Sequence, residues 1–248
     1  MKVTYTTPGG SYYRLFDDML NQTHLLIAGA TGSGKSVVIN RMIYTALVKY
    51  TPVRCQFILI DPKRVELVAF KKLPHTIAYA SEPGEMVEAL DRAMMITEQR
   101  YREMQRKELK KYEGAAVYVI IDELADLMTT NRKEVQPLLQ RLCQIGRAAN
   151  VHVVAATQCP LSSVIPTPIK VNFDSRVGLR TRSAQDSRNI LGVKGCETLP
   201  RFGEGFYMTA EAIQHTTIPM NDERQLQELI EYWQPKKKGL FEWLRKAI

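Results

Sequence analysis

Residues Gly29-Ala30-Thr31-Gly32-Ser33-Gly34-Lys35-Ser36 match the phosphate-binding pattern G-x-x-x-x-G-K-[ST] without a mismatch. The apolar run Leu25-Leu26-Ile27-Ala28 precedes this stretch, and a helical pattern begins at Val37. The motif therefore stands in the context it needs, a strand followed by a glycine-rich turn and a helix N-terminus. There, successive backbone N–H groups and the helix dipole favour a bound phosphate. The alternative is an accidental glycine-rich turn between a strand and a helix.

The motif predicts a role for each of its polar residues. Lys35 is predicted to pair with the β- and γ-phosphates of a nucleoside triphosphate, and the Ser36 hydroxyl to ligate Mg²⁺. The backbone of the whole loop contributes to the same site. The predicted nucleotide-binding residues are therefore Gly29, Ala30, Thr31, Gly32, Ser33, Gly34, Lys35, Ser36 and Val37.

The composition is ordinary for a globular protein and basic in balance. The 248 residues are predicted to form one large domain, and 45% of them are hydrophobic. Their net charge of +8 suits a nucleic acid or an anionic membrane surface, and it equally suits a merely basic soluble protein. No stretch reaches the roughly 18 uninterrupted apolar residues of a membrane span. The four cysteines are scattered without a C-x-x-C pair, so we expect reduced thiols and a cytoplasmic protein.

Apolar runs and helical periodicities alternate along the chain. Continuous apolar runs predict buried strands at 25–28, 57–60, 117–121, 151–157 and 173–179. Helical spacing predicts helices at 36–50, 83–112 and 135–149, then a hairpin within 205–218 and a last helix at 222–233. This order predicts an α/β fold, a P-loop NTPase with a mainly parallel central sheet and helices on both faces.

Three segments are predicted along the chain. Residues 1–24 form a lead-in with a short helix at 12–20, residues 25–234 form the ATPase domain, and residues 235–248 form a tail. The tail combines five cationic residues with apolar side chains at helical spacing, which suits a membrane surface or a groove on a partner protein. A tail that packs on its own domain or stays disordered is the alternative.

Two carboxylates follow the strand predicted at 117–121. Asp122 lies at the carboxyl end of that strand, where open α/β sheets bind ligands, and is predicted to hold Mg²⁺ through water. Glu123 can orient and partly deprotonate an attacking water, which predicts a hydrolase. A helix N-cap is the alternative for this pair. Gln158, at the tip of the next strand, can contact the γ-phosphate or the water, and an ordinary polar strand end is the alternative.

Seven segments stand in a specific order: His24-Leu25-Leu26-Ile27-Ala28-Gly29, Leu59-Ile60-Asp61-Pro62-Lys63 with Val65-Glu66-Leu67, Leu73-Pro74-His75, Ile121-Asp122-Glu123-Leu124-Ala125-Asp126-Leu127-Met128, Arg147-Ala148-Ala149, Ala156-Thr157-Gln158 and Asp186-Ser187-Arg188. Together they resemble the FtsK/SpoIIIE family of DNA-pumping ATPases over about residues 22–220. The resemblance implies a RecA-like domain that uses ATP and Mg²⁺. It further implies a hexameric ring around double-stranded DNA, with ATP at the subunit interfaces.

The resemblance also implies roles for several arginines. Arg147 becomes an arginine finger for a neighbouring subunit, because a permanently charged guanidinium suits the charge that grows on the γ-phosphoryl group. From the sequence alone, Arg147 would instead complement a helix C-terminus. Arg188 matches a family position and is the first candidate for a DNA backbone contact. Cys159 and Ala184 depart from the arginine and lysine that members commonly carry, and the candidates to replace those charges are Arg180 and Arg182.

The sequence therefore predicts an ATPase that moves double-stranded DNA for a mobile element, a phage or a chromosome-transfer process. Two other classes stay open: the ATPase of a protein-secretion or virion-packaging apparatus, and a scaffold that uses ATP only to assemble. The Asp122–Glu123 pair argues against the scaffold. A chain of this length is expected to hold the motor domain without the membrane spans or the DNA-reading winged helix of larger members.

Overall fold

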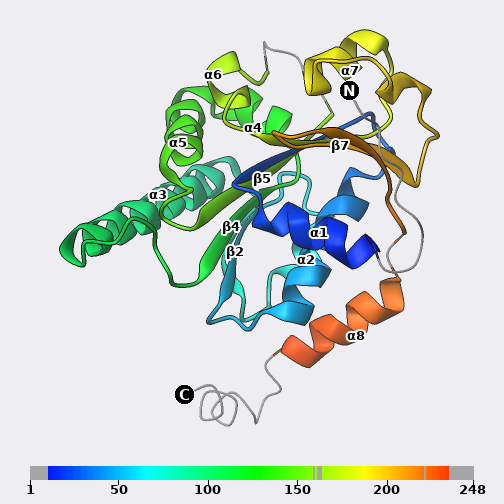
Figure 1. Ribbon diagram of the computed structural model, residues 1–248. Helices are drawn as coiled ribbons and strands as arrows, with labels where there is room; N and C mark the ends of the chain where they lie inside the picture. The colour runs from blue at the N-terminus through cyan, green and yellow to red at the C-terminus, as the bar shows by residue number, and fades with distance from the viewer. Residues whose placement is uncertain (1–10, 159, 161–163, 221, 235–248) are drawn as a thin grey trace.

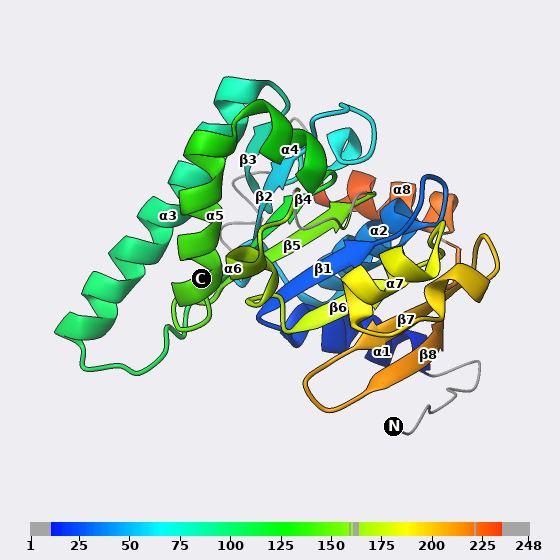
Figure 2. The same cartoon turned by 90° about the horizontal axis from the view of Figure 1, so that it is seen from above.

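A single eight-stranded sheet runs through the computed structural model, which describes residues 11–158, 160, 164–220 and 222–234. Its strand order is β3-β2-β4-β5-β1-β6-β7-β8. Figure 1 labels β2, β4, β5 and β7 of this sheet, and Figure 2 labels every strand. Six strands are parallel: β1 (His24–Ala28), β2 (Cys55–Ile60), β3 (Thr76–Ala80), β4 (Ala116–Ile121), β5 (Val151–Thr157) and β6 (Ser175–Gly178). The hairpin of β7 (Glu204–Met208) and β8 (Ile213–Thr217) extends the sheet in antiparallel fashion. The predicted mainly parallel α/β sheet is confirmed.

Helices cover both faces of the sheet, as Figure 2 shows from above. One face carries α1 (Ser11–Asn21), α2 (Lys35–Lys49) and α8 (Glu223–Trp233). The other carries α3 (Pro83–Arg106), α4 (Leu124–Thr130), α5 (Arg132–Ile145) and α6 (Thr167–Lys170). Each face of the sheet has its own hydrophobic core, and successive residues of a strand pack alternately into one or the other. Leu25 and Ile27 pack under α2, while Leu26 packs on the opposite face. This explains the continuous apolar runs of the sequence, because a strand covered on both sides has no polar face.

A smaller third core lies beside β6. There α7 (Ala184–Leu191) packs with the 3₁₀ turn η2 (Cys196–Thr198), and Ile190 and Leu191 are buried against Ala28 at the end of β1. A second 3₁₀ turn, η1 (Val68–Phe70), lies between β2 and β3. The segment after β6 is therefore packed against the end of the strand that leads into the phosphate loop.

Some predicted boundaries are wrong. The helix predicted at 83–112 ends at Arg106, because Glu108 adopts a left-handed φ of 54° and turns the chain back. Tyr112 then donates its backbone N–H to Ala148 and lies under the guanidinium of Arg100. The helix predicted at 135–149 is also displaced, since α5 begins at Arg132 and ends at Ile145. Four helices and strands among the described residues had no counterpart in the prediction, namely β3, α4, α6 and α7, and neither had the two 3₁₀ turns.

The short helix predicted at 12–20 is confirmed as α1, and its residues Phe16, Met19 and Leu20 are buried in the core shared with α2. The division into a lead-in and an ATPase domain stays a prediction. The tail at 235–248 and Cys159 lie outside the described residues. Within the part of the chain that the structure describes, no helix has both the length and the apolar character to cross a membrane.

Candidate active site

The sheet topology brings four polar segments together at the carboxyl ends of the parallel strands. Strands β2, β4, β5 and β1 are neighbours and parallel, with Ile60 beside Ile121 and Ala28 beside Thr157. The residues that follow these strands therefore lie side by side at the carboxyl end of the sheet, where such folds bind ligands. They are the phosphate loop after β1, Asp61 to Lys63 after β2, Asp122 and Glu123 after β4, and Gln158 after β5.

The phosphate loop has the backbone that its glycines permit. Gly32 and Gly34 take positive φ values of 70° and 100°, which side chains with a Cβ atom adopt only with strain. Gly34 is the N-cap of α2 and offers no side chain, so the helix N-terminus is open to an anion. The loop is also tied to neighbouring strands, because Gly29 N donates to Thr157 O at 3.3 Å and Ala30 N donates to Arg180 O at 2.8 Å.

Lys35 lies under this loop. Its Nζ donates to the backbone oxygens of Gly29 at 2.9 Å and Ala30 at 3.0 Å. Burial lowers the pKa of Lys35, and the nearby carboxylates of Glu123 and Asp122 oppose that shift. The ammonium is thus held by two neutral carbonyls in a poorly solvated place, where a phosphate would be a stronger partner.

One cavity of about 390 Å³ contains most of the predicted site. The predicted residues that line it are Thr31, Gly32, Gly34, Lys35, Ser36, Val37, Asp122, Glu123 and Gln158. Ser33 lines neither this cavity nor its neighbour, and its buried hydroxyl has no hydrogen-bond partner among the described residues. The uncapped N-terminus of α2 and the side chain of Lys35 do line the cavity, so the residues present fit a nucleotide phosphate.

The cavity also has lining residues that sequence reasoning did not single out. They are Lys63, Glu66, Phe202 and Met220. Phe202 and Met220 are 54% and 67% exposed, so each offers apolar surface at the mouth of the cavity where a nucleotide base could lie. Nothing in the local sequence around either residue indicates this position, because the chain reaches it only through the hairpin and the start of α8.

Carboxylates gather on the other side of the cavity. Burial raises the pKa of Asp122 to about 7, and the negative charges of Glu66 and Asp61 add to the shift. Asp61 is fully buried and accepts hydrogen bonds from Leu67 N at 3.0 Å and Tyr79 OH at 3.3 Å, while its other oxygen has no partner among the described residues. This concentration of negative charge suits a divalent cation.

The fit to Mg²⁺ depends on the nucleotide. Within the described residues, no group of three or more His, Cys, Asp or Glu side chains could hold a metal ion alone. Ser36 and Asp122 line the same cavity and offer a hydroxyl and a carboxylate, the oxygen ligands that Mg²⁺ prefers together with substrate phosphates. The donor set therefore fits a metal that arrives with the phosphates.

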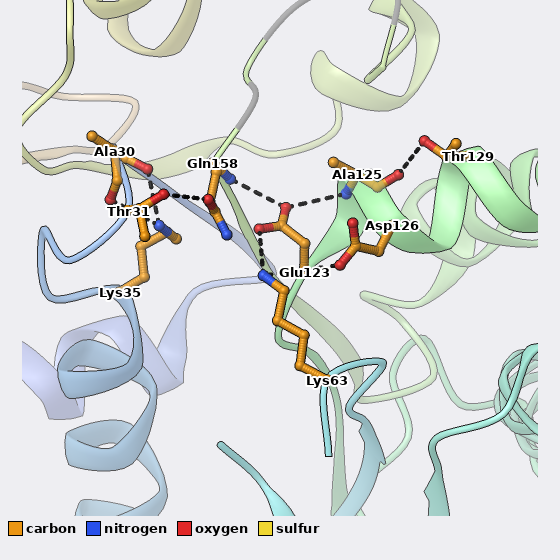
Figure 3. A network of polar contacts seen from close by, with 10 residues as sticks. Ala30, Thr31, Lys35, Lys63, Glu123, Ala125, Asp126, Thr129 and Gln158 are labelled. Atoms are coloured by element: carbon orange, nitrogen blue, oxygen red, sulfur yellow. Dashed lines mark hydrogen bonds and ion pairs between the residues drawn. The ribbon is translucent and has the colours of Figure 1, made fainter. Parts of the chain in front are cut away.

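Glu123 is the centre of a hydrogen-bonded network, drawn in Figure 3. Its Oε1 accepts from Ala125 N at 3.3 Å and from Gln158 N at 3.1 Å, and Lys63 Nζ lies 3.4 Å from its Oε2. The bond to Ala125 makes Glu123 the N-cap of α4, so the capping alternative is correct as a description of the contact. It does not exclude a catalytic role, because the same carboxylate faces the cavity with Lys35 and Ser36.

Gln158 joins the same network from the tip of β5. Its Oε1 accepts from the Thr31 hydroxyl at 2.6 Å, so the side chain bridges the phosphate loop to the strand beside it. Its backbone N–H meanwhile holds Glu123. Gln158 is therefore more than a polar strand end, since it contacts both the phosphate loop and the candidate base.

Arg147 lies away from this site. It is exposed in the turn between α5 and β5, at the amino end of the strand that carries Gln158 at its other end. Seven residues of extended strand separate the two ends, a span of about 20 Å. Arg147 therefore cannot reach the cavity of its own chain, and its role in a neighbour's site stays a prediction.

The three arginines predicted to contact DNA are exposed and belong to the segment after β6. Arg182 lines a second cavity of about 360 Å³, which shares Thr31 and Gln158 with the first. Arg180 is bonded through its backbone to Ala30, and Arg188 lies on α7. Two of the three are thus adjacent to the phosphate loop.

Comparison with known protein families and curated sequences gives a consistent result. The sequence model of the FtsK/SpoIIIE family matches residues 12–116 and 111–163. The protein "DNA translocase FtsK" of Rickettsia bellii (strain RML369-C) is 37% identical over 262 residues, covering 88% of this chain and 35% of the relative. The chain therefore spans about a third of the length of this relative.

Solved structures share the fold at lower identity. The pCW3 conjugation coupling protein TcpA, solved as a monomer with ATPγS, superposes with a TM-score of 0.75 at 21% identity over 87% of this chain and 66% of its own. The cytoplasmic domain of the type VII secretion ATPase EccC of Thermomonospora curvata gives 0.74 at 21% identity over 86% of this chain and 28% of its own. At these identities the likeness shows a shared P-loop ATPase fold.

Proposed function

The chain belongs to the FtsK/SpoIIIE family, and from that membership and the geometry of the site we propose that it hydrolyses ATP to move double-stranded DNA. One observation carries the enzymatic part of the proposal. Lys35 and Ser36 of the phosphate loop share a single cavity with the carboxylates of Asp122 and Glu123. A simple nucleotide binder would need the first pair, whereas hydrolysis also needs a group that accepts the proton of water.

Each residue has a distinct task in the proposed reaction. Lys35 exchanges its two backbone carbonyls for the β- and γ-phosphates. Ser36 and Asp122 would hold Mg²⁺, which when bound neutralises charge on the phosphate oxygens. Glu123, held by the backbone N–H groups of Ala125 and Gln158, orients the water and accepts its proton as the γ-phosphoryl group leaves.

The proposal includes an assembly, because the described residues that line the cavity include the lysines Lys35 and Lys63 but no arginine. Arg147 is an exposed guanidinium at the opposite end of β5, so it would act in the site of the next subunit of a ring. A hexameric ring with ATP at its interfaces would place each Arg147 next to a neighbour's phosphate loop.

The DNA contact is proposed for the segment after β6. Arg180, Arg182 and Arg188 are exposed cations, of which Arg180 and Arg182 adjoin the phosphate loop. Guanidinium groups bind backbone phosphates without reading the sequence. The similar proteins support this choice, since FtsK is a DNA translocase and TcpA is a conjugation coupling protein.

ATPase turnover with and without linear duplex DNA tests the proposal. We expect Mg²⁺-dependent turnover that DNA stimulates, and no nucleotide binding by Lys35→Ala. Turnover that DNA leaves unchanged would favour the secretion or packaging class instead. Nucleotide binding without turnover in any condition would favour a scaffold.

A further inference from the structure

Lys63 forms an ion pair with the candidate base Glu123, although the two residues follow different strands. Lys63 Nζ lies 3.4 Å from Glu123 Oε2 and 3.9 Å from Asp126 Oδ2, and Figure 3 shows its ammonium facing both carboxylates. The Glu123 side chain is only 3% exposed, whereas that of Lys63 is 40% exposed. A nearly buried carboxylate is thus held by a cation that still has freedom to move.

The strand order explains how Lys63 reaches this place. Lys63 comes just after β2, and Glu123 just after β4, and these strands are neighbours with Ile60 beside Ile121. The loop that carries Lys63 is fixed on both sides, because Arg64 N donates to Asp61 O at 3.1 Å and Leu67 N donates to the Asp61 carboxylate. The backbone is therefore anchored while the four-carbon side chain of Lys63 can swing.

Two anions would compete for this ammonium in a nucleotide-bound site. Lys63 lines the cavity together with Lys35 and Ser36, so a terminal phosphate in that cavity would lie within reach of its side chain. A γ-phosphate carries more charge than the Glu123 carboxylate and would attract Lys63 more strongly. The carboxylate oxygen that Lys63 occupies in this structure is one that Glu123 needs in order to accept a proton from water.

We propose that Lys63 is a positioning residue that restrains Glu123 while no triphosphate is bound and transfers to the γ-phosphate when ATP enters. The inference rests on the proposed ATPase function and adds a regulatory step to it. ATP entry would itself release the base, and the diphosphate left after hydrolysis would return Lys63 to Glu123. Turnover would then be limited to sites that hold a complete triphosphate.

Equilibrium binding of ATPγS and ADP tests the idea without relying on hydrolysis. Lys63→Met keeps the length of the side chain and removes its charge, so it should weaken ATPγS binding about tenfold, the equivalent of one charge-assisted hydrogen bond. Binding of ADP, which has no γ-phosphate, should change less than about twofold, and it also reports that the variant is folded. Lys63→Arg should restore most of the preference for ATPγS.

Arg64→Met is the matched control, because Arg64 is the next residue, is exposed, and pairs with Glu82 outside the cavity. It should leave both affinities as they are in the natural chain. If Lys63→Met and Arg64→Met behave alike, or if Lys63→Met weakens ADP and ATPγS equally, the proposed transfer to the γ-phosphate is wrong.

A double-mutant cycle tests the competition between the two anions. Glu123→Gln should tighten ATPγS binding about threefold to fivefold, because it frees Lys63 from an ion pair of ordinary partly exposed strength. In the Lys63→Met background, the same substitution should change nothing. An equal effect in both backgrounds would overturn the proposed transfer of Lys63 from Glu123 to the γ-phosphate. Failure of the natural chain to bind ATPγS at all would instead refute the nucleotide site on which that proposal rests.

Discussion

Arg147 offers the sharpest test of the proposed assembly, because the structure places it about 20 Å from the site of its own chain. Arg147→Ala should bind ATP normally and lose turnover by about 10³-fold or more, the usual contribution of an arginine finger. Lys35→Ala should fail to bind ATP while keeping its finger. Each variant alone is therefore inactive, because one lacks the finger on one side of the interface and the other lacks the phosphate-loop lysine on the opposite side.

Mixing the two variants gives a quantitative expectation. An interface is complete when its phosphate loop comes from the Arg147→Ala chain and its finger comes from the Lys35→Ala chain. With random assembly at equal amounts, about a quarter of the interfaces in a head-to-tail ring meet this condition. Activity should therefore rise to at most about a quarter of the natural value, provided that sites act independently, and should decline symmetrically on either side of the equal mixture.

The assay is steady-state ATPase over a series of mixing ratios, with native mass spectrometry to show that mixed rings have formed. ATP binding by Arg147→Ala is the control for folding, because a misfolded variant would also lose ATP binding. No recovery at any ratio despite mixed rings, or full activity of Arg147→Ala alone, would refute an intersubunit finger.

Four further expectations follow from the site and its surroundings. Glu123→Gln should still bind ATP but lose at least about 100-fold in single-turnover hydrolysis, and normal turnover would remove Glu123 from the role of base. Arg188→Ala should lose DNA-stimulated ATPase with basal turnover intact, and should flatten the salt dependence of DNA binding by about one unit of slope; an unchanged slope would exclude a phosphate contact. Cys159→Arg should tighten duplex binding in fluorescence anisotropy, and weaker or equal binding would count against a DNA-facing position. Burial and the nearby His152 lower the pKa of His24 from 6.5 to about 3, so below pH 6.5 the unfolded chain binds a proton that the folded chain does not. The free energy of unfolding, measured with urea, should therefore fall below pH 6.5 by up to about 1.4 kcal/mol per pH unit from this residue. The same pH dependence of stability in His24→Gln as in the natural chain would contradict this.

The position of the phosphate loop between a strand and a helix could be predicted because its sequence pattern is local. Eight consecutive residues contain the glycines, the lysine and the serine, and the apolar run before them identifies the strand. The pair Asp122 and Glu123 could be predicted for the same reason, since a carboxylate directly after a buried strand falls at the ligand-binding edge of any parallel sheet. Short-range sequence patterns therefore predicted most of the residues that line the cavity.

Residues that enter the site through topology were missed. Lys63 contacts Glu123 only because β2 and β4 are neighbours, and no spacing within the chain predicts that pairing. A signal was present, since Asp61-Pro62-Lys63 follows a predicted buried strand just as Asp122 and Glu123 do, and polar residues after parallel strands share one edge. Phe202 and Met220 left no comparable signal, because they reach the cavity from the edge of the antiparallel hairpin and from the approach to α8.

Secondary structure was missed where burial is incomplete or elements are short. Strand β3 lies at the edge of the sheet, and four of its five residues are only partly buried, so it lacks the continuous apolar run of the central strands. Helix α4 has seven residues and begins directly after Glu123, whose side chain was interpreted for its chemistry although it also caps that helix. A residue with two roles gives a sequence pattern that supports either one.

The contacts around the phosphate loop indicate how a change at the γ-phosphate would reach the proposed DNA-facing segment. Ala30 N is bonded to Arg180 O, so the loop and the segment after β6 share a backbone hydrogen bond of 2.8 Å. Thr31 is bonded to Gln158, whose backbone in turn holds Glu123. Loss of the γ-phosphate would therefore disturb Arg180 through one bond, whereas it would reach Arg188 on α7 only through the third core. On this geometry Arg180 is suited to respond to hydrolysis, and Arg188, carried by a helix that packs in that core, is suited to maintain a grip on the duplex between steps.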